Sequence, residues 1–244
     1  MKASCSIFFL LFCAPLFSLA MTPGQTLGGV PGFICAPTAE MLRDGTLCLG
    51  ASYIPKKILN YTEHRRNAVT AFVSLTFLPF LELDLRLTRQ LDLPKGVSHT
   101  VDRSPVLRIR LHRETKTLPA LVLGFHDLFS TIEEGTARHF AATYLVIGKR
   151  LTLGTWDVYP SLGYSHPLYA NRQSEIEGWF GGIRLEWRQL PHLSLAADWV
   201  NQRGSFGIAV FPARWLHVKG AIIGADTFAC NLCMQFSLFS VFKR

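Results

Sequence analysis

The sequence has few charged residues and no long apolar run outside its N-terminus. Only 17% of its 244 residues are charged, against roughly 25% in an average soluble domain, which argues against a disordered or highly solvated chain. The longest uncharged runs beyond the N-terminus are residues 21–39, which prolines interrupt, and residues 227–242. A transmembrane helix needs about 20 apolar residues. The sequence after the N-terminus therefore excludes a helical membrane span, although 49% of the residues are hydrophobic.

Motifs of several enzyme classes are also missing. No GxSxG, GxGxxG, Walker loop or HExxH occurs, so serine-hydrolase, nucleotide-binding and zinc-protease chemistry have no local support. The pairs Ser165–His166 and His126–Ser130 are close only by chance spacing, because a nucleophile and base must also be aligned with oxyanion donors. We expect no catalytic residue and no cofactor, which leaves a lipid hydrolase as the least supported function.

The N-terminus has the three parts of a secretory signal. Lys2 supplies a positive start, residues 7–17 form an apolar core, and Ser18-Leu19-Ala20 places small residues where a signal peptidase cleaves. Pro15 interrupts a core that is already too short to span a membrane. We expect residues 1–20 to be a cleaved signal peptide, without lipid attachment.

Four cysteines remain after that cleavage: Cys35, Cys48, Cys230 and Cys233. Export places them in an oxidising compartment, where four cysteines allow three pairings. Cys230 and Cys233 have CxxC spacing, but on a strand they point to opposite faces, which disfavours a local disulfide and shared metal ligation. With no second CxxC and no nearby histidine pair, we expect no metal site.

The mature sequence does contain period-two alternation. Residues 81–88 place four leucines on one face of a strand and four polar residues on the other. The pattern recurs at residues 107–112, 183–188, 193–199 and 232–238, and further strands are expected at residues 46–54, 67–77, 118–127, 139–150, 154–165, 204–212 and 215–224. Many of these strands are about ten residues long, which is the length that crosses a bilayer at a tilt.

The connections between these strands differ in length. A proline lies between alternating runs at residues 77–81, 189–193 and 211–216, which predicts tight hairpins on one rim. Longer polar segments at residues 55–66, 91–104, 128–138 and 166–177 are then expected on the opposite rim. Tryptophans within or at the ends of strands are typical of membrane-interface girdles; they are Trp156, Trp179, Trp187, Trp199 and Trp215.

These patterns predict an all-β fold, an antiparallel transmembrane β-barrel of roughly 10–12 strands. It would occupy residues 46–244, and residues 21–45 would form an N-terminal segment that acts as a plug or a periplasmic strap. A secreted soluble lipid-binding barrel is the alternative. That barrel would have the opposite faces, with Leu81, Leu83 and Leu85 inside.

If the leucine faces contact lipid, the charged residues on the other face line the lumen. They are Glu82, Asp84, Arg86, Arg108, Arg110, Arg184, Glu186 and Arg188. Both signs are present, so internal pairing can offset the cost of burial. An internal salt-bridge network that fills a narrow barrel is the favoured interpretation, and a polar conduit or a contact surface for anionic glycan is the other. The net charge of +8 suits acidic polysaccharide, lipid phosphate or nucleic acid, and of these we expect no nucleic-acid partner.

Several blocks of residues carry a family resemblance across the mature chain. The most specific block is Gly32-Phe33-Ile34 with Pro37–Leu42 and Asp44–Leu47, and the later blocks include Leu118–Ala120, Tyr144–Val146, Phe180–Ile183, Leu193–Leu195, Asp198-Trp199, Phe206–Ile208 and Trp215-Leu216. The motif positions are Pro37, Thr38, Ala39, Gly124, Asp127 and Lys149. Together they resemble the YjbH family of outer-membrane proteins linked to exopolysaccharide production. Cys35-Ala36 departs from the polar residue usual in the opening block.

The resemblance implies a non-enzymatic barrel in the outer membrane of a Gram-negative cell that assists exopolysaccharide biosynthesis, secretion or surface retention. It also implies outer-membrane lipid, an anionic exopolysaccharide and other polysaccharide-export proteins as partners. The alternative functions are a general diffusion pore or a purely structural outer-membrane barrel. A barrel-embedded lipid hydrolase has less support.

Overall fold

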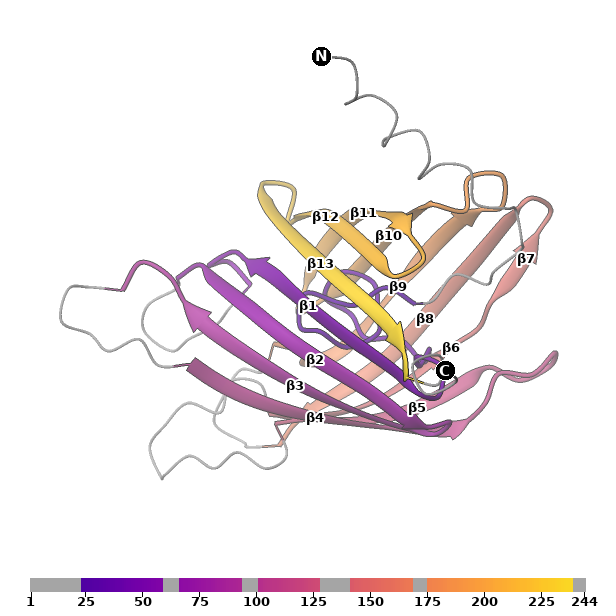
Figure 1. The fold of residues 1–244 in the computed structure, drawn as a ribbon, viewed down its shortest axis with the longest axis horizontal. Coiled ribbons are helices and arrows are strands. Elements are labelled where there is room, and N and C mark those ends of the chain that lie inside the picture. The colour runs from indigo at the N-terminus through magenta and orange to yellow at the C-terminus, as the bar shows by residue number, and fades with distance from the viewer. Residues whose placement is uncertain (1–22, 59–65, 94–100, 128–140, 169–174, 239–244) are drawn as a thin grey trace, which may run out of the picture.

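The computed structural model describes residues 23–58, 66–93, 101–127, 141–168 and 175–238. They form one antiparallel sheet that closes on itself as a barrel (Figure 1). The strands are β1 Thr46–Ile54, β2 Ala68–Leu78, β3 Leu81–Gln90, β4 Val101–His112, β5 Ala120–His126, β6 Ala142–Gly148, β7 Leu151–Leu153, β8 Trp156–Pro167, β9 Gly178–Trp187, β10 Leu193–Val200, β11 Arg203–Ala213, β12 Leu216–Ile223 and β13 Thr227–Ser237. The predicted signal peptide, residues 1–20, lies outside the described residues.

The wall of the barrel has twelve positions, although thirteen strands are numbered. Both β6 and the short β7 pair with β8, so the two are parts of one wall strand, interrupted at Lys149-Arg150. Every other neighbour in the sheet is the next strand along the chain, except that β1 pairs with β13 to close the ring. The expected antiparallel barrel is confirmed. Among the described residues, no helix is long and apolar enough to cross a membrane.

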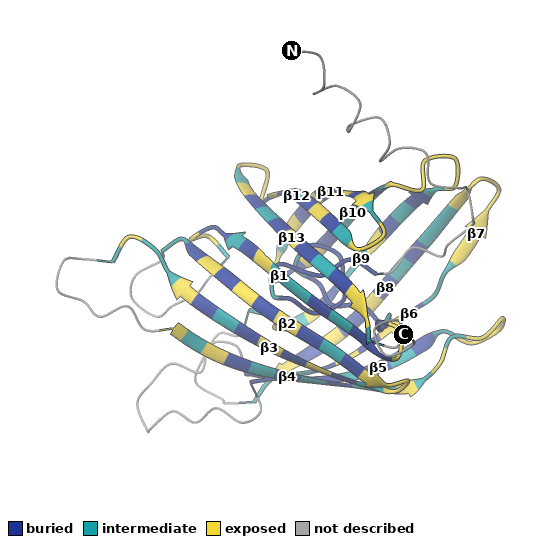
Figure 2. Cartoon of the chain, viewed as in Figure 1, coloured by how far each residue is buried: buried dark blue, intermediate teal, exposed yellow. Residues whose placement is uncertain are grey.

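Burial alternates along the strands (Figure 2), and the exposed face is apolar whereas the buried face carries both polar and apolar side chains. On β3, Leu83 and Leu85 are 43% and 42% exposed, whereas Glu82 and Asp84 between them are buried. The alternation in the sequence predicts these faces because successive strand side chains point to opposite sides. The arrangement excludes the soluble-barrel alternative, in which the leucines would line the interior.

All twelve predicted segments coincide with strands, but several strands begin earlier than their patterns indicate. β4 starts at Val101, within the segment 91–104 that was expected to be a connection, because Arg103 and Asp102 pair with Leu87 and Thr88 of β3. β9 starts at Gly178 and contains two further glycines in its first half. Because glycine has no side chain, this part of the strand shows no alternation in the sequence. β8 likewise continues to Pro167, inside the expected connection 166–177.

The two ends of the barrel have different connections. At the turn rim, as we call one end, the predicted tight hairpins join β2 to β3, β9 to β10 and β11 to β12, and Leu238 donates a backbone hydrogen bond to Gly45. The opposite end, the loop rim, carries the connections that contain residues 59–65, 94–100, 128–140 and 169–174, all outside the described residues. Two of the loop-rim connections are short. Asn201 and Gln202, which join β10 to β11, have φ of 49° and 61°, as in a type I′ hairpin.

The tryptophans lie near both rims on the outer wall. Trp156 and Trp187 stack at a centroid distance of 5.7 Å near the turn rim, and Trp215 lies in the turn-rim hairpin between β11 and β12. Trp179 and Trp199 lie near the loop-rim ends of β9 and β10. Aromatic residues at both edges of an apolar band are typical of barrels in a bilayer, where their rings sit at the two interfaces.

A disulfide joins the strands that close the barrel. Cys48 on β1 is bonded to Cys233 on β13, with 6.7 Å between their Cα atoms and a sequence separation of 185. Cys230, which lies on the opposite face of β13 from Cys233, is a free cysteine, and so is Cys35. The bond therefore connects the first and last wall strands across their seam.

Candidate functional site in the barrel interior

Residues 23–42, which we call the inner segment, lie inside the barrel and are mostly buried (Figure 1). Two isolated antiparallel bridges fold the segment back on itself, Gln25 with Pro31 and Gly32 with Pro37. Its beginning is held by Gln235 of β13, whose Nε2 donates to the Pro23 carbonyl at 3.4 Å. Its end is held by Glu82, which accepts from the Leu42 amide at 3.2 Å. Both wall residues lie near the turn rim, so the segment enters and leaves the lumen on that side.

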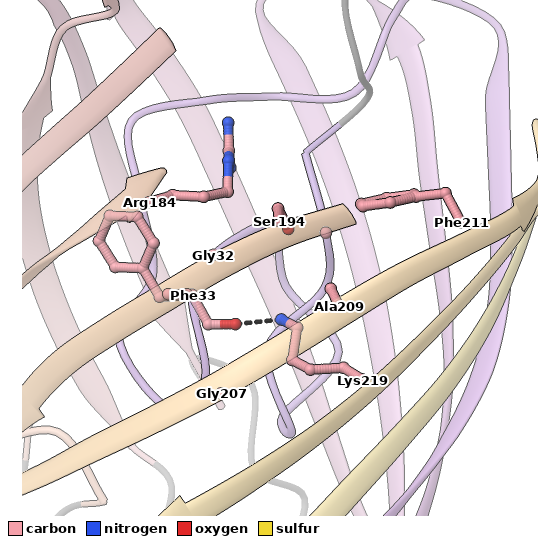
Figure 3. A pocket seen from close by; sticks show the side chains of 10 residues that line it. Gly32, Phe33, Arg184, Ser194, Gly207, Ala209, Phe211 and Lys219 are labelled. Atoms are coloured by element: carbon pink, nitrogen blue, oxygen red, sulfur yellow. Dashed lines mark hydrogen bonds between the residues drawn. The ribbon is translucent and has the colours of Figure 1, made fainter. Parts of the chain in front are cut away.

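The middle of the inner segment is bound through its backbone. One carboxylate oxygen of Asp198, on β10, accepts hydrogen bonds from the amides of Ile34, Cys35 and Ala36 at 2.9, 2.6 and 2.8 Å. Lys219, on β12, donates from Nζ to the carbonyls of Gln25, at 2.6 Å, and Phe33 (Figure 3). Charge-assisted bonds of this kind are stronger than neutral ones. An acid and a base on the wall therefore fix the segment at its amides and its carbonyls.

Arg108, on β4, links the wall to the end of the inner segment. Its guanidinium bonds Glu82 at 2.6 Å, and its Nη2 donates to the carbonyls of Thr38 and Glu40 at 2.5 and 2.9 Å. Its Nε donates to the Tyr144 hydroxyl at 3.1 Å. Each of the three guanidinium nitrogens therefore donates at least one hydrogen bond, as a buried polar group requires.

The Tyr144 ring explains one family-motif glycine. It packs across Gly124 so closely that a Cβ at that position would lie 2.1 Å from the ring. Only glycine leaves room for the tyrosine to reach Arg108. The motif residue thus acts through the space it leaves.

Glu40 carries the remaining ionic contact of the inner segment. Its two carboxylate oxygens accept from both terminal nitrogens of Arg184, on β9, at 2.6 and 2.7 Å. Arg150 lies 3.4 Å from the same carboxylate, and Glu186 accepts from Nε of Arg184 at 2.6 Å. We call these four side chains the Glu40 cluster. Burial opposes ionisation of Glu40, but the attraction and hydrogen bonds of Arg184 and Arg150 outweigh it and lower the pKa of Glu40.

A second ion pair lies in the half of the barrel nearer the loop rim. Arg86, on β3, binds Glu175 through both terminal nitrogens at 2.5 and 3.0 Å, and its Nε donates to Thr88 at 3.0 Å. Glu175 precedes β9 in the chain. The interior therefore contains charge pairs at two levels, one nearer the turn rim and one nearer the loop rim.

A small cavity lies beside the inner segment (Figure 3). Its wall includes Arg184, Ser194, Lys219 and the ring of Phe211, and the inner segment contributes Phe33. The cavity therefore combines two cationic side chains, a hydroxyl and two aromatic rings. At about 10 Å³ the cavity has room for about one water molecule while the inner segment is in place.

The structure brings most of the expected lumen residues together, with one correction. Glu82, Asp84, Arg86, Arg108, Arg184 and Glu186 are all buried on the inner face. Arg110 lies at the turn-rim end of β4 and donates to the Pro79 carbonyl at 2.7 Å. Arg188 is not in the lumen: its side chain is 50% exposed and pairs with Asp157 at 2.9 Å. Asp157 is on the inner-face register of β8, so Arg188 keeps the face that alternation predicts, but it follows the last residue of β9 at the turn rim, where the wall no longer covers it.

The other family-motif positions contribute no charged side chain to the Glu40 cluster or to the Arg108–Glu82 pair. Thr38 contacts Arg108 through its backbone carbonyl. Pro37 and Thr38 belong to the folded inner segment, where the Thr38 amide donates to Pro31 at 3.1 Å, and Ala39 is buried. Asp127 follows β5 with a φ of 51°, and Lys149 donates to the Lys116 carbonyl at 2.8 Å on the surface.

Sequence reasoning did not single out Glu40, Arg150, Asp198 or Lys219 as interior contacts. The alternation in residues 215–224 held a signal for Lys219, since it places His217 and Lys219 on the face opposite Val218. The bonds that Asp198 and Lys219 make to backbone atoms leave no mark in the sequence of the inner segment.

Ser165 and His166 do not form a nucleophile–base pair. Ser165 is buried and its hydroxyl donates to the Ile176 carbonyl at 2.8 Å, whereas His166, next along β8, lies on the exposed face. His126 is buried, and Ser130 lies outside the described residues. Within the described part of the chain, no group of three or more His, Cys, Asp or Glu residues is placed to hold a metal ion.

The fold and interior define a class of protein: a closed antiparallel β-barrel with an apolar outer wall and a charged, filled interior. The chain belongs to the YjbH family, because the family model described as "Exopolysaccharide biosynthesis protein YbjH" matches residues 25–199. A search of curated proteins gave no significant match. Among 22 solved chains that match is the "COG4313 outer membrane channel from Pseudomonas putida F1", at 11% identity and a TM-score of 0.40, covering 81% of this chain and 97% of that one.

Proposed function

We propose that this chain is a non-enzymatic outer-membrane protein that assists the biosynthesis, secretion or surface retention of an exopolysaccharide in a Gram-negative cell. The observation that carries the proposal is the apolar outer wall of a barrel whose sequence belongs to an exopolysaccharide-biosynthesis family. The aromatic residues near both rims support a bilayer location. Outer-membrane lipid is then the immediate partner, and an anionic exopolysaccharide and other export proteins are further partners.

The proposed orientation places the turn rim in the periplasm and the loop rim outside the cell. Short connections on the periplasmic side and longer ones outside are usual for such barrels. The N-terminal segment, residues 21–45, then acts as a plug that enters from the periplasm. Its backbone bonds to Asp198, Lys219 and Arg108 support this role, because they hold it across the lumen.

A general diffusion pore is the second candidate, and the filled interior is evidence against it. Planar-bilayer recordings distinguish the two, since an open polar lumen passes ions steadily. We expect the protein, folded in detergent and inserted into a bilayer, to show no steady open-channel current. A stable current of porin size would favour the pore instead.

Cell fractionation tests the proposed location. We expect the protein in the outer-membrane fraction, with a folded form that changes its mobility on a gel only after heating. Recovery as a soluble periplasmic protein would overturn the location. A deletion strain tests the glycan part separately, because an unchanged amount and release of polysaccharide would remove that part while leaving the barrel.

A further inference from the structure

The inner segment brings a single charge into the lumen. Glu40 is the only charged residue between positions 23 and 42. Elsewhere the segment is held at backbone amides and carbonyls, by Asp198 and Lys219 among others. At Glu40 alone the wall binds a carboxylate group. The wall at this point is therefore built to hold an anion, and any other carboxylate of similar reach would meet the same donors.

The charge balance at this point depends on Glu40. Arg184 and Arg150 face two carboxylates, those of Glu40 and Glu186. When Glu40 leaves, two guanidinium groups face one carboxylate, and one positive charge is uncompensated. Arg184 offers the paired N–H groups that match the two oxygens of a carboxylate. The vacated site would thus attract an incoming carboxylate by charge and by geometry.

The site can be reached from the turn rim. The Arg150 side chain is 27% exposed and that of Glu40 13%, whereas Arg184 and Glu186 lie deeper, at 5% and 10%. Arg150 stands where β6 gives way to β7, close to the turn-rim end of the wall. Under the proposed orientation, a polymer arriving from the periplasm would meet Arg150 first and Arg184 next.

The neighbouring groups suit a sugar ring. The guanidinium carbon of Arg184 lies 5.3 Å from the centre of the Tyr159 ring. Arg184 also borders the cavity of about 10 Å³ to which the wall contributes Ser194 and Phe211 (Figure 3), and a sugar ring would fit there only after the inner segment, which fills the space beside it, has left. Aromatic faces pack against the apolar face of a ring, and hydroxyl and cationic groups bind its polar edge. A carboxylate on a sugar ring would place both kinds of surface in contact.

We infer that Arg184 and Arg150 form a binding site for the carboxylate of an acidic sugar residue, a uronic acid of the exopolysaccharide, and that Glu40 occupies this site in the resting barrel. The inference rests on the proposed function, because it names the substrate class. Glu40 is tethered at a high effective concentration, so a free uronate competes poorly while it is present. Entry of the polymer and release of the inner segment are thereby coupled through one pair of arginines.

The test measures binding of trigalacturonate to the full protein in detergent by calorimetry, with maltotriose as the neutral control. Glu40→Gln keeps the size of the side chain and removes its charge. We expect this variant to bind trigalacturonate about tenfold or more tightly than the wild type does. Neither the variant nor the wild type should bind maltotriose. Adding Arg184→Gln to Glu40→Gln should abolish the binding. The inference is overturned if Glu40→Gln gains no affinity, if maltotriose binds equally, or if the double variant still binds.

Folding is checked by the heat-induced gel shift, and Glu40→Ala serves as a second variant with the same expected gain. Arg150→Gln in the Glu40→Gln background should weaken binding about tenfold, since it removes the outer of the two cations. Failure of the site and failure of the function are distinguishable. Absence of binding, with a polysaccharide defect in the deletion strain, overturns only the site, whereas specific binding with an unchanged glycan overturns only the function.

Discussion

The guanidinium of Arg108 lies 2.6 Å from the carboxylate of Glu82, and both side chains are completely buried within the barrel. The same guanidinium holds the carbonyls of Thr38 and Glu40. One ion pair thus joins the wall strands β3 and β4 to the inner segment. Its loss should affect the barrel and the inner segment together.

Replacing Arg108 with Met should lower the free energy of unfolding by about 3–5 kcal/mol, because it leaves the Glu82 carboxylate buried without its partner. The double replacement with Glu82→Leu should lose less, since the Glu82 carboxylate is then no longer buried without its partner. Urea titration of the detergent-folded protein measures both. Arg188→Gln, which breaks the exposed pair with Asp157, is the control and should leave stability nearly unchanged. Equal effects of the two arginine variants would contradict the buried pair.

Labelling of Cys35 should report on the contact between Asp198 and the inner segment. Burial, then the carboxylates of Asp198 and Glu175, raise the pKa of the Cys35 thiol well above its usual value. Because the thiolate is the reactive form, Cys35 should react slowly with maleimide at pH 8 and faster as the pH rises. Asp198→Asn removes one of these charges and should shift the labelling curve to lower pH.

The labelling is done in a Cys230→Ser background, because Cys230 is the other free cysteine in the described residues. Asp157→Asn, at the turn rim, serves as the control and should leave the curve where it is. Superimposable curves for the wild type and Asp198→Asn would argue that Asp198 does not face the segment.

An arginine on the outer wall should destabilise the barrel according to its depth. Leu85 lies near the middle of β3, and Leu85→Arg should cost about 2–4 kcal/mol in a bilayer. Leu153→Arg, on the exposed short strand β7 near the turn rim, should cost about 0–1 kcal/mol. Refolding into lipid vesicles at graded urea concentrations gives both values. Equal costs at the two positions would mean that the wall does not span a bilayer in this way.

The disulfide across the seam should contribute to stability. Cys48→Ser with Cys233→Ser should lower the free energy of unfolding by about 2–5 kcal/mol, since the bond closes a loop of 185 residues in the unfolded chain. The temperature of the heat-induced gel shift should fall in the double variant. It should fall by the same amount in the wild type when the disulfide is reduced. Cys230→Ser should have no effect, and a wild type insensitive to reductant would contradict the pairing.

The wall was predictable from sequence because its information is local. In residues 81–88, the alternation of leucines with polar residues predicts which face of the strand each side chain occupies. The extent of such alternating runs predicts the strands. The start of β4 escaped this reasoning, since its extent there is set by pairing with β3, as of Val101 with Arg89, and residues 101–106 show no clear alternation of their own. Arg188 has the face that alternation predicts, but alternation does not show where a strand ends, and beyond Trp187 the wall no longer covers its side chain.

The contacts of the inner segment could not be predicted in this way. It has no periodicity, and its partners bind mostly backbone atoms, which every residue has. Asp198 accepts hydrogen bonds from three successive backbone amides, and these bonds do not depend on which side chains the residues carry. Glu40 did carry a side-chain signal, as the one charge in an otherwise neutral stretch. Its partners Arg184 and Arg150 come from wall strands far along the chain, so closure of the barrel was needed to bring them to it.

The central claim is that the protein serves an exopolysaccharide from the outer membrane. Quantifying cell-surface and released polysaccharide in a deletion strain tests it most directly, with complementation by the full chain and by a copy that lacks residues 1–20. The account predicts an altered amount or release of polysaccharide that the full chain restores and the unexported copy does not. An unchanged polysaccharide profile in the deletion strain, or equal restoration by both copies, would contradict it.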